Sequence, residues 1–161
     1  MANILEVCVD SYASAMAAIA GGADRLELCS ALAVGGLTPS PVLLRQIREA
    51  SSIPVRCLMR TRGGDFLYTR EEICQMAEEI RTLRAEGADG FVIGCLTADG
   101  DLDIDAMKPL LEAAEVPKSH CIAASTFPGI SVKLTGMLQH WESTQFLPAA
   151  VPETDNQPVI P

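Results

Sequence analysis

A strand-then-helix rhythm, repeated four times within the first 115 residues, is the feature that most constrains how this chain of 161 residues folds. Apolar-rich segments typical of strands lie at Ile4–Asp10, Asp24–Cys29, Pro54–Arg62 and Asp89–Leu96. Strands separated by helical crossovers run parallel, so the pattern predicts an α/β fold. A (β/α)8 barrel needs about 250 residues for eight such units. The sequence therefore predicts a TIM-type barrel of which only the first four βα units, a half-barrel, are present.

Capping signals place the helices between these strands. They run from about Ser11 to Ala20, from Ser40 to Ala50, from Thr69 to Gly87, and onward from Asp103 or Asp105. Ser40 with Pro41 is an N-cap followed by proline at the first helical position, and Thr69 with Glu72 forms a capping box. Pro109 weakens the prediction of the fourth helix, because it removes one backbone donor.

The chain changes character after Glu115. Residues 116–161 hold six of the ten prolines, both histidines and the single tryptophan, and they show no strand-helix period. We therefore divide the chain into residues 1–115, the half-barrel, and residues 116–161, an irregular Pro-rich tail. His120, Cys121 and His140 are metal ligands by residue type, but their scatter along an irregular tail argues against a metal site there.

The composition limits which binding partners and which cell compartment are expected. The net charge of −9 argues against nucleic acid as a partner, which needs a basic surface, and against docking on anionic membranes. The sequence contains no run of about 18 uninterrupted apolar residues, so no membrane span is predicted. The N-terminus shows no secretory signal. We predict a cytoplasmic protein without an organic cofactor, with the nucleus as an alternative compartment in a eukaryote. The six cysteines form no C-x-x-C pair and are expected to be reduced thiols.

Side-chain alternation sorts the predicted strands into two faces. One face is apolar, and in a barrel it meets the helices. The other face points into the barrel interior and carries Glu6, Cys8, Asp10, Glu27, Cys29, Arg56, Arg60 and Arg62. Because unpaired charges in a barrel interior are costly, we predict that the two glutamates pair with Arg56 and Arg60 in an internal network.

Cys8 and Cys29 are predicted at matching depths near the C-terminal ends of neighbouring strands, on the inward face. Adjacent strands are about 4.8 Å apart, so two sulfurs can reach one ion, and soft thiolates suit Cu(I) or Zn(II). Two thiolates also suit the low coordination number of Cu(I). The alternative is that both are small thiols buried in a packed interior. The spacing of the two cysteines alone favours this alternative. The other strand and helix cysteines, Cys57, Cys74 and Cys95, are predicted to be structural.

The loop TRGGDFLYT (61–69) follows the third strand at the end where barrel sites are built. Its backbone amides, together with Arg60 and Arg62, suit an anionic ligand. The alternative is a tight turn in which Asp65 pairs with an arginine, and the residues alone do not decide between the two. If the loop binds an anionic substrate, the chain would be an enzyme with Asp10 or Glu27 as its acid/base group.

Several ordered motifs resemble the CutC copper-homeostasis family over about residues 4–115. They are EVCVDS (6–11), GGADRLELCS (21–30), GGLTPS (35–40), RGGDF (62–66) and GADGFVIGCLTADG (87–100). The resemblance implies a cytosolic TIM-type barrel associated with copper handling, with Cu(I) ligands at Cys8 and Cys29. It therefore favours the metal interpretation of these two cysteines over the buried-thiol alternative.

The chain departs from the family pattern in two places. Thr61 replaces the proline of the family's R-P-R-G-G-D-F motif, and VPKSHCIAASTF (116–127) stands where the family continues with a fifth strand, V-T-F-H-R-A-F-D. We expect an alternative or frame-shifted C-terminus. Half a barrel leaves the first and fourth strands as open edges, which predicts a homo-oligomer or pairing with a full-length chain.

These observations lead to one main prediction and two alternatives. We predict a copper homeostasis protein that binds Cu(I) through Cys8 and Cys29 and is not an enzyme. The first alternative is a TIM-barrel enzyme that acts on a small anionic substrate, and the second is an inactive truncated form. Replacing both cysteines by serine separates the first two, since only copper binding requires the thiols.

Overall fold

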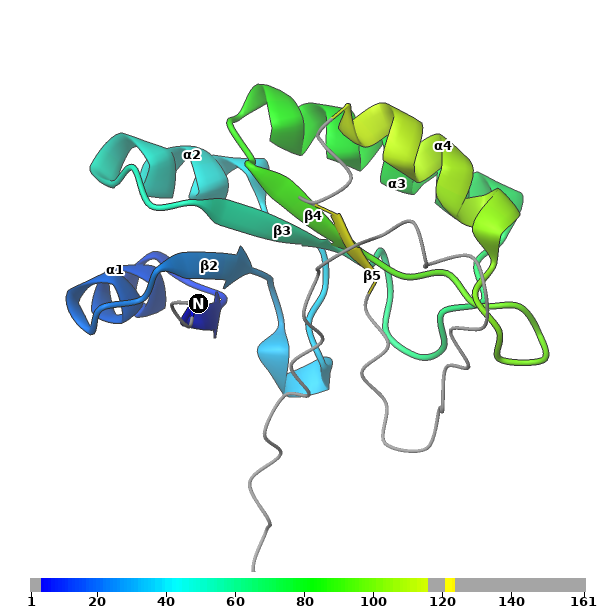
Figure 1. Ribbon diagram of the computed structural model, residues 1–161, viewed down its shortest axis with the longest axis horizontal. Helices are drawn as coiled ribbons and strands as arrows, with labels where there is room; N and C mark the ends of the chain where they lie inside the picture. The colour runs from blue at the N-terminus through cyan, green and yellow to red at the C-terminus, as the bar shows by residue number, and fades with distance from the viewer. Residues whose placement is uncertain (1–3, 116–120, 124–161) are drawn as a thin grey trace, which may run out of the picture.

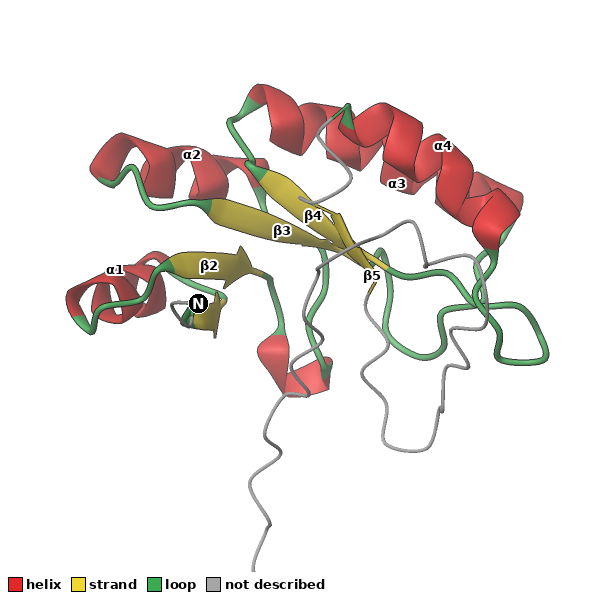
Figure 2. Ribbon diagram, in the orientation of Figure 1, coloured by secondary structure: helices red, strands yellow, loops and turns green. Residues whose placement is uncertain are grey.

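The computed structural model describes residues 4–115 and 121–123. Its strands form one parallel sheet in the order of the sequence (Figure 1). The strands are β1 (Glu6–Val9), β2 (Arg25–Leu28), β3 (Val55–Met59), β4 (Gly90–Ile93) and β5 (Cys121–Ala123). The helices are α1 (Tyr12–Ala20), α2 (Pro41–Ala50), α3 (Arg70–Ala85) and α4 (Ile104–Ala114), with a short 3-10 helix η1 (Leu32–Val34) after β2 (Figure 2). The predicted α/β fold with alternating strand-helix units is confirmed.

All four α-helices pack on the same face of the sheet. One hydrophobic core includes Ala15, Leu44, Ile80 and Leu110 from the helices and Leu26, Cys57 and Phe91 from the strands. A separate buried cluster contains Cys29, Leu58 and Val92, whose side chains alternate to the opposite face. A doubly wound sheet would carry helices on both faces and would reverse its strand order. Sequential strands with helices on one face therefore identify the TIM-barrel type of architecture.

The helices begin where the predicted capping residues lie. The side chain of Ser40 caps α2, Thr69 and Glu72 close the capping box of α3, and Asp103 caps α4. Helix α4 continues through Pro109 to Ala114, because its buried face packs against α3. None of the helices in the described part of the chain is long and apolar enough to cross a membrane.

Strand β5 corrects the prediction that no strand follows Glu115. It pairs in parallel with β4, with Val92 opposite Ile122. Three residues are too few to show a periodic pattern, so this strand is defined by its pairing and not by its composition. Among the described residues the sheet edges are β1, as predicted, and β5 in place of the fourth strand. The remainder of the predicted tail, with His120 and His140, lies outside the described residues.

Candidate functional site

The inner face of the sheet, opposite the helices, brings together most of the residues that the sequence singled out. In the strand register Glu6 lies opposite Arg25, Cys8 lies opposite Glu27, and Glu27 lies opposite Arg56. A thiol, a carboxylate and a guanidinium therefore form one row across β1, β2 and β3. Cys29 lies one row further toward the C-terminal ends of the strands, where its amide donates a 2.9 Å hydrogen bond to the Val9 carbonyl.

The two cysteines are on the same face but at different depths. Cys8 is level with Glu27, so Cys29 lies two residues further along the sheet than Cys8. The prediction of matching depths is therefore wrong. The strands of a barrel tilt, and their pairing is staggered from one strand to the next. The similar motifs E-V-C and E-L-C are consequently displaced along the sheet by two residues.

Glu27 lies beside both thiols. The Cys29 Sγ is 3.9 Å from Glu27 Oε1, and Cys8 lies directly opposite Glu27 in the strand register. Burial and the charge of Glu6 raise the pKa of Glu27, while the two thiol hydrogen bonds and Arg56 oppose that rise. The staggered register thus places one carboxylate between two sulfur atoms that come from neighbouring strands.

Both thiols are strongly biased toward the protonated form. Partial burial raises the pKa of Cys8 to about 12, and the negative charges of Glu27 and Glu6 add to this rise. Burial, followed by the charge of Glu27, raises the pKa of Cys29 well above its usual range. Cys8 is exposed to solvent and Cys29 is buried. A soft metal ion that binds here must therefore displace two protons.

Gly36, from the loop between η1 and α2, covers Cys29. Its φ is +85°, and a Cβ at this position would lie 3.7 Å from Cys29 Sγ and 2.7 Å from Leu58 Cδ2. Only glycine allows so close an approach in this backbone conformation. No side-chain pattern in the sequence pointed to Gly36 as part of the site. The Gly35-Gly36 pair directly follows η1, which itself comes shortly after the E-L-C-S motif.

The predicted internal ion-pair network is present in part. Glu6 pairs with Arg25, and its Oε2 lies 3.7 Å from Arg56 Nη1. Arg56 is buried, so this cluster compensates charge inside the sheet face. Arg60 is not in the network, which corrects the prediction for that residue.

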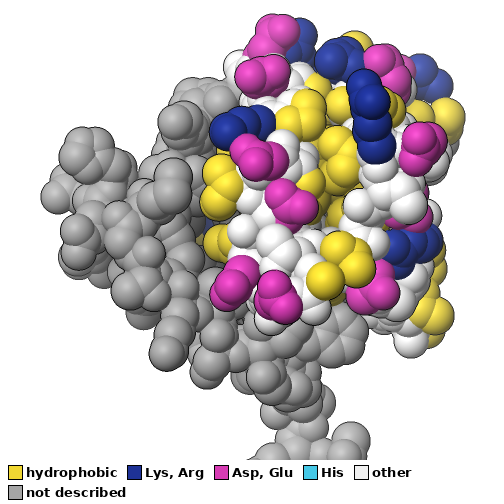
Figure 3. Space-filling model, turned by 90° about the vertical axis from the view of Figure 1, so that its right-hand side faces the viewer, with side chains coloured by type: hydrophobic (Ala, Val, Ile, Leu, Met, Phe, Trp, Pro, Cys, Tyr) yellow, Lys and Arg dark blue, Asp and Glu magenta, His cyan; other side chains and the backbone are white. Residues whose placement is uncertain are grey.

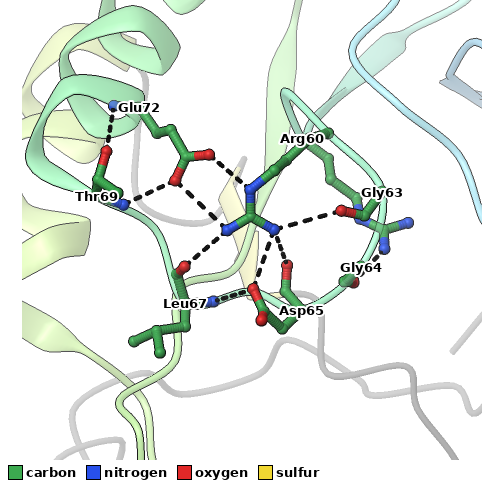
Figure 4. Close-up of polar contacts among 8 residues, drawn as sticks. Arg60, Gly63, Gly64, Asp65, Leu67, Thr69 and Glu72 are labelled. Atoms are coloured by element: carbon green, nitrogen blue, oxygen red, sulfur yellow. Dashed lines mark hydrogen bonds and ion pairs between the residues drawn. The ribbon is translucent and has the colours of Figure 1, made fainter.

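Arg60 instead joins two loops through their backbone carbonyls. Its Nη1 donates to the carbonyls of Gly36 at 3.1 Å and Val34 at 3.4 Å. Its Nη2 donates to the carbonyl of Gly64 at 2.7 Å (Figure 4). The guanidinium also lies 4.8 Å from the ring centroid of Phe66. A planar guanidinium has several N–H donors, so it can donate to carbonyls of two loops at once. An ion pair with one carboxylate would tie Arg60 to only one loop.

Arg62 holds the start of α3. Its Nε donates to Glu72 at 2.6 Å, and its terminal nitrogens reach Asp65 Oδ1 at 3.0 Å and the Leu67 carbonyl at 2.8 Å (Figure 4). This geometry is the tight turn in which Asp65 pairs with an arginine. The terminal nitrogens of Arg60 and the guanidinium of Arg62 thus donate to groups of the protein itself.

The remaining predicted site residues are distributed around this centre. Asp10 is exposed at the end of β1, and Cys74 is exposed on α3. Cys57 and Cys95 belong to the core under the helices, where burial raises the pKa of each thiol to about 12. In residues 4–115 and 121–123, no three His, Cys, Asp or Glu side chains are grouped so that they could hold a metal ion.

Comparison with known proteins identifies the family of the chain. A sequence model of the CutC family matches residues 3–123. The chain belongs to the CutC family. Its CutC relatives include the copper homeostasis protein cutC homolog of Drosophila melanogaster, 50% identical over 111 residues that cover 68% of this chain and 42% of the relative. A CutC family protein of Vibrio cholerae is 48% identical over 110 residues, covering 68% of this chain and 43% of the relative.

A solved CutC structure supports the fold assignment. The CutC protein of Streptococcus agalactiae superposes with a TM-score of 0.66 at 32% identity, over 71% of this chain and 57% of that protein. The chain spans less than half the length of the curated CutC relatives described above. The resemblance predicted from the motifs is confirmed, and the family match extends through β5 to residue 123.

Proposed function

We propose that this chain binds Cu(I) as its cargo in copper homeostasis, with Cys8 and Cys29 as the ligands. One observation carries the proposal: on the face of the sheet away from the helices, two thiols from neighbouring strands lie beside Glu27, with Cys8 opposite Glu27 in the register and Cys29 Sγ 3.9 Å from Glu27 Oε1. Both thiols are therefore neighbours of the same carboxylate on this sheet face. Membership of the CutC family, which includes a relative named for copper homeostasis, supports copper as the metal.

The chemistry of the donors supports the monovalent ion. Thiolate sulfur is a soft ligand that favours Cu(I), whereas ions such as Mg2+ and Ca2+ require several oxygen ligands. Cys8 is exposed and Cys29 is buried, so an ion can arrive at the first thiol and be shielded at the second. The enzyme alternative has no comparable support, because the donors of Arg62 are engaged by Asp65, Glu72 and backbone carbonyls.

Anaerobic titration with Cu(I) against a competing chelator tests the proposal. The unmodified chain is expected to bind one equivalent, and Cys8→Ser/Cys29→Ser is expected to lose this binding, because a serine hydroxyl is a hard and weak ligand for Cu(I). Each single substitution is expected to weaken binding strongly, since one thiolate remains.

Cys74→Ser is the matched control, because Cys74 is an exposed cysteine on α3, away from the inner face. It is expected to bind Cu(I) like the unmodified chain. Circular dichroism of each variant verifies the fold. Equal binding by the double variant and the control would show that Cys8 and Cys29 are not the ligands.

A further inference from the structure

Exposed hydrophobic side chains gather at one end of the described molecule. Among the exposed large hydrophobic side chains of residues 4–115, only Ile4 and Leu5 lie at the N-terminal end of the strands. The others lie in loops after the strands or in the first turn of the following helix. They are Tyr12, Leu32, Val34, Val42, Leu67 and Ile104. Scattered exposed apolar residues need no explanation, but apolar residues concentrated at one end mark an interaction surface.

The centre of this end is built from the loops after β2 and β3. Leu32 is 38% exposed and Val34 is 58% exposed in η1, while Leu67 is 45% exposed in the next loop. Arg60 joins these two loops, since its guanidinium donates to the carbonyls of Val34 and Gly64. The apolar side chains are therefore presented on loops that the fold holds together.

Carboxylates lie on both sides of this apolar centre. The strand order places the loop after β1, with Asp10, on one side and the loop after β4, with Asp99 and Asp101, on the other. The amide of Leu96 donates to the carbonyl of Phe66 at 2.9 Å, which ties the loop after β4 to the loop after β3. Figure 3 views the side toward which the strands run, and shows hydrophobic side chains through the middle, with Asp and Glu as well as Lys and Arg around them.

The basic residues of these loops do not offset that charge. Residues 10–11, 29–40, 60–69 and 94–103 contain only two, Arg60 and Arg62. Arg60 is 3% exposed, and Arg62 pairs with Asp65 and Glu72. Asp10, Asp99 and Asp101 are exposed. The loops therefore present an apolar centre with negative charge on either side.

We propose that this rim, made of Asp10, Leu32, Val34, Leu67, Asp99 and Asp101, is a docking surface for a protein that presents an apolar side chain flanked by lysines or arginines. Charge complementarity selects such a partner and speeds its approach. It also disfavours a second copy of this chain, whose net charge is −9. The rim lies at the end of the sheet nearest Cys29. If the proposed copper function holds, docking here brings a partner to the metal pair, so copper can pass between the two proteins.

The probe is a fluorescein-labelled peptide, Lys-Lys-Trp-Leu-Lys-Lys, titrated into the copper-free full-length chain at low salt while fluorescence anisotropy is recorded. Leu32→Ser/Val34→Ser is expected to weaken binding about tenfold, because the apolar contact is lost. Asp99→Asn/Asp101→Asn is expected to weaken it severalfold and to reduce its dependence on salt. All these side chains are exposed, so the substitutions leave the fold intact.

Two matched variants control for nonspecific attraction to an acidic protein. Ile4→Ser/Leu5→Ser removes exposed apolar side chains at the opposite end, and Glu49→Gln/Glu112→Gln removes two carboxylates from the helices. Both are expected to bind the peptide like the unmodified chain. Equal losses in control and rim variants, or no binding at all, would overturn the proposal. Cys8→Ser/Cys29→Ser is expected to bind the peptide normally, so a failure of the docking surface is distinguishable from a failure of the copper site.

Discussion

Arg60→Met is expected to lower the free energy of unfolding by about 3 kcal/mol, because it removes the charged donor from a buried carbonyl and from a part-buried carbonyl in two different loops. The side chain is 3% exposed, and it donates to the carbonyls of Gly36 at 3.1 Å and Gly64 at 2.7 Å. Methionine retains much of the volume but offers no donor. Urea denaturation followed by circular dichroism measures the loss.

Arg45→Met is the control for this substitution. Arg45 pairs with Glu86 at 3.2 Å on the surface, and its side chain is 51% exposed. Exposed pairs contribute between about 0 and 1 kcal/mol, so the control is expected to change stability little. If the two variants were equally stable, the carbonyl contacts of Arg60 would make no net contribution to the free energy of unfolding. In Arg60→Met the loop that carries Gly36 is also expected to loosen, which would speed alkylation of Cys29.

The affinity for Cu(I) is expected to rise about 100-fold for each unit of pH, because binding displaces one proton from each thiol. A thiol is protonated below its pKa, so the competition from protons weakens as the pH rises. With the pKa of Cys8 raised to about 12 and that of Cys29 raised as well, the dependence is expected to continue between pH 9 and 10. Competition titrations from pH 7 to 10, corrected for protonation of the chelator, measure the slope.

Glu27→Gln identifies the cause of this pH dependence. The charge of Glu27 raises the pKa of both thiols, so its removal is expected to lower both pKa values and to strengthen Cu(I) binding at neutral pH. Glutamine keeps the size of the side chain and one acceptor oxygen. A slope that flattens above pH 9 in the unmodified chain would mean that the thiols have ordinary pKa values.

Side-chain alternation predicted the two faces of the sheet because a buried strand has a period of two residues. It separated Cys29, on the inner face, from Cys57, in the core under the helices, and the structure confirms both placements. The helix starts were equally predictable, since Ser40, Thr69 and Asp103 act through hydrogen bonds to residues two or three positions away.

Features that depend on contacts between distant segments were not predictable in the same way. The two-residue offset between Cys8 and Cys29 depends on how β1 and β2 are paired, and similar motifs suggest equal depth. The role of Arg60 depends on the folding of η1 and of the next loop around its guanidinium. A charged residue on an inward face suggests an ion pair, whereas here the acceptors are main-chain carbonyls that no side-chain pattern reveals.

The offset between the two cysteines also bears on oxidation. With about 4.8 Å between strands and about 3.3 Å per residue along them, a two-residue offset separates the Cα atoms by about 8 Å. A disulfide requires Cα atoms about 4.4–6.8 Å apart. Oxidation is therefore expected not to cross-link Cys8 to Cys29, and mass spectrometry after mild oxidation would detect the bond if it formed. The two-residue displacement of similar motifs thus keeps Cys8 and Cys29 from forming a disulfide with each other.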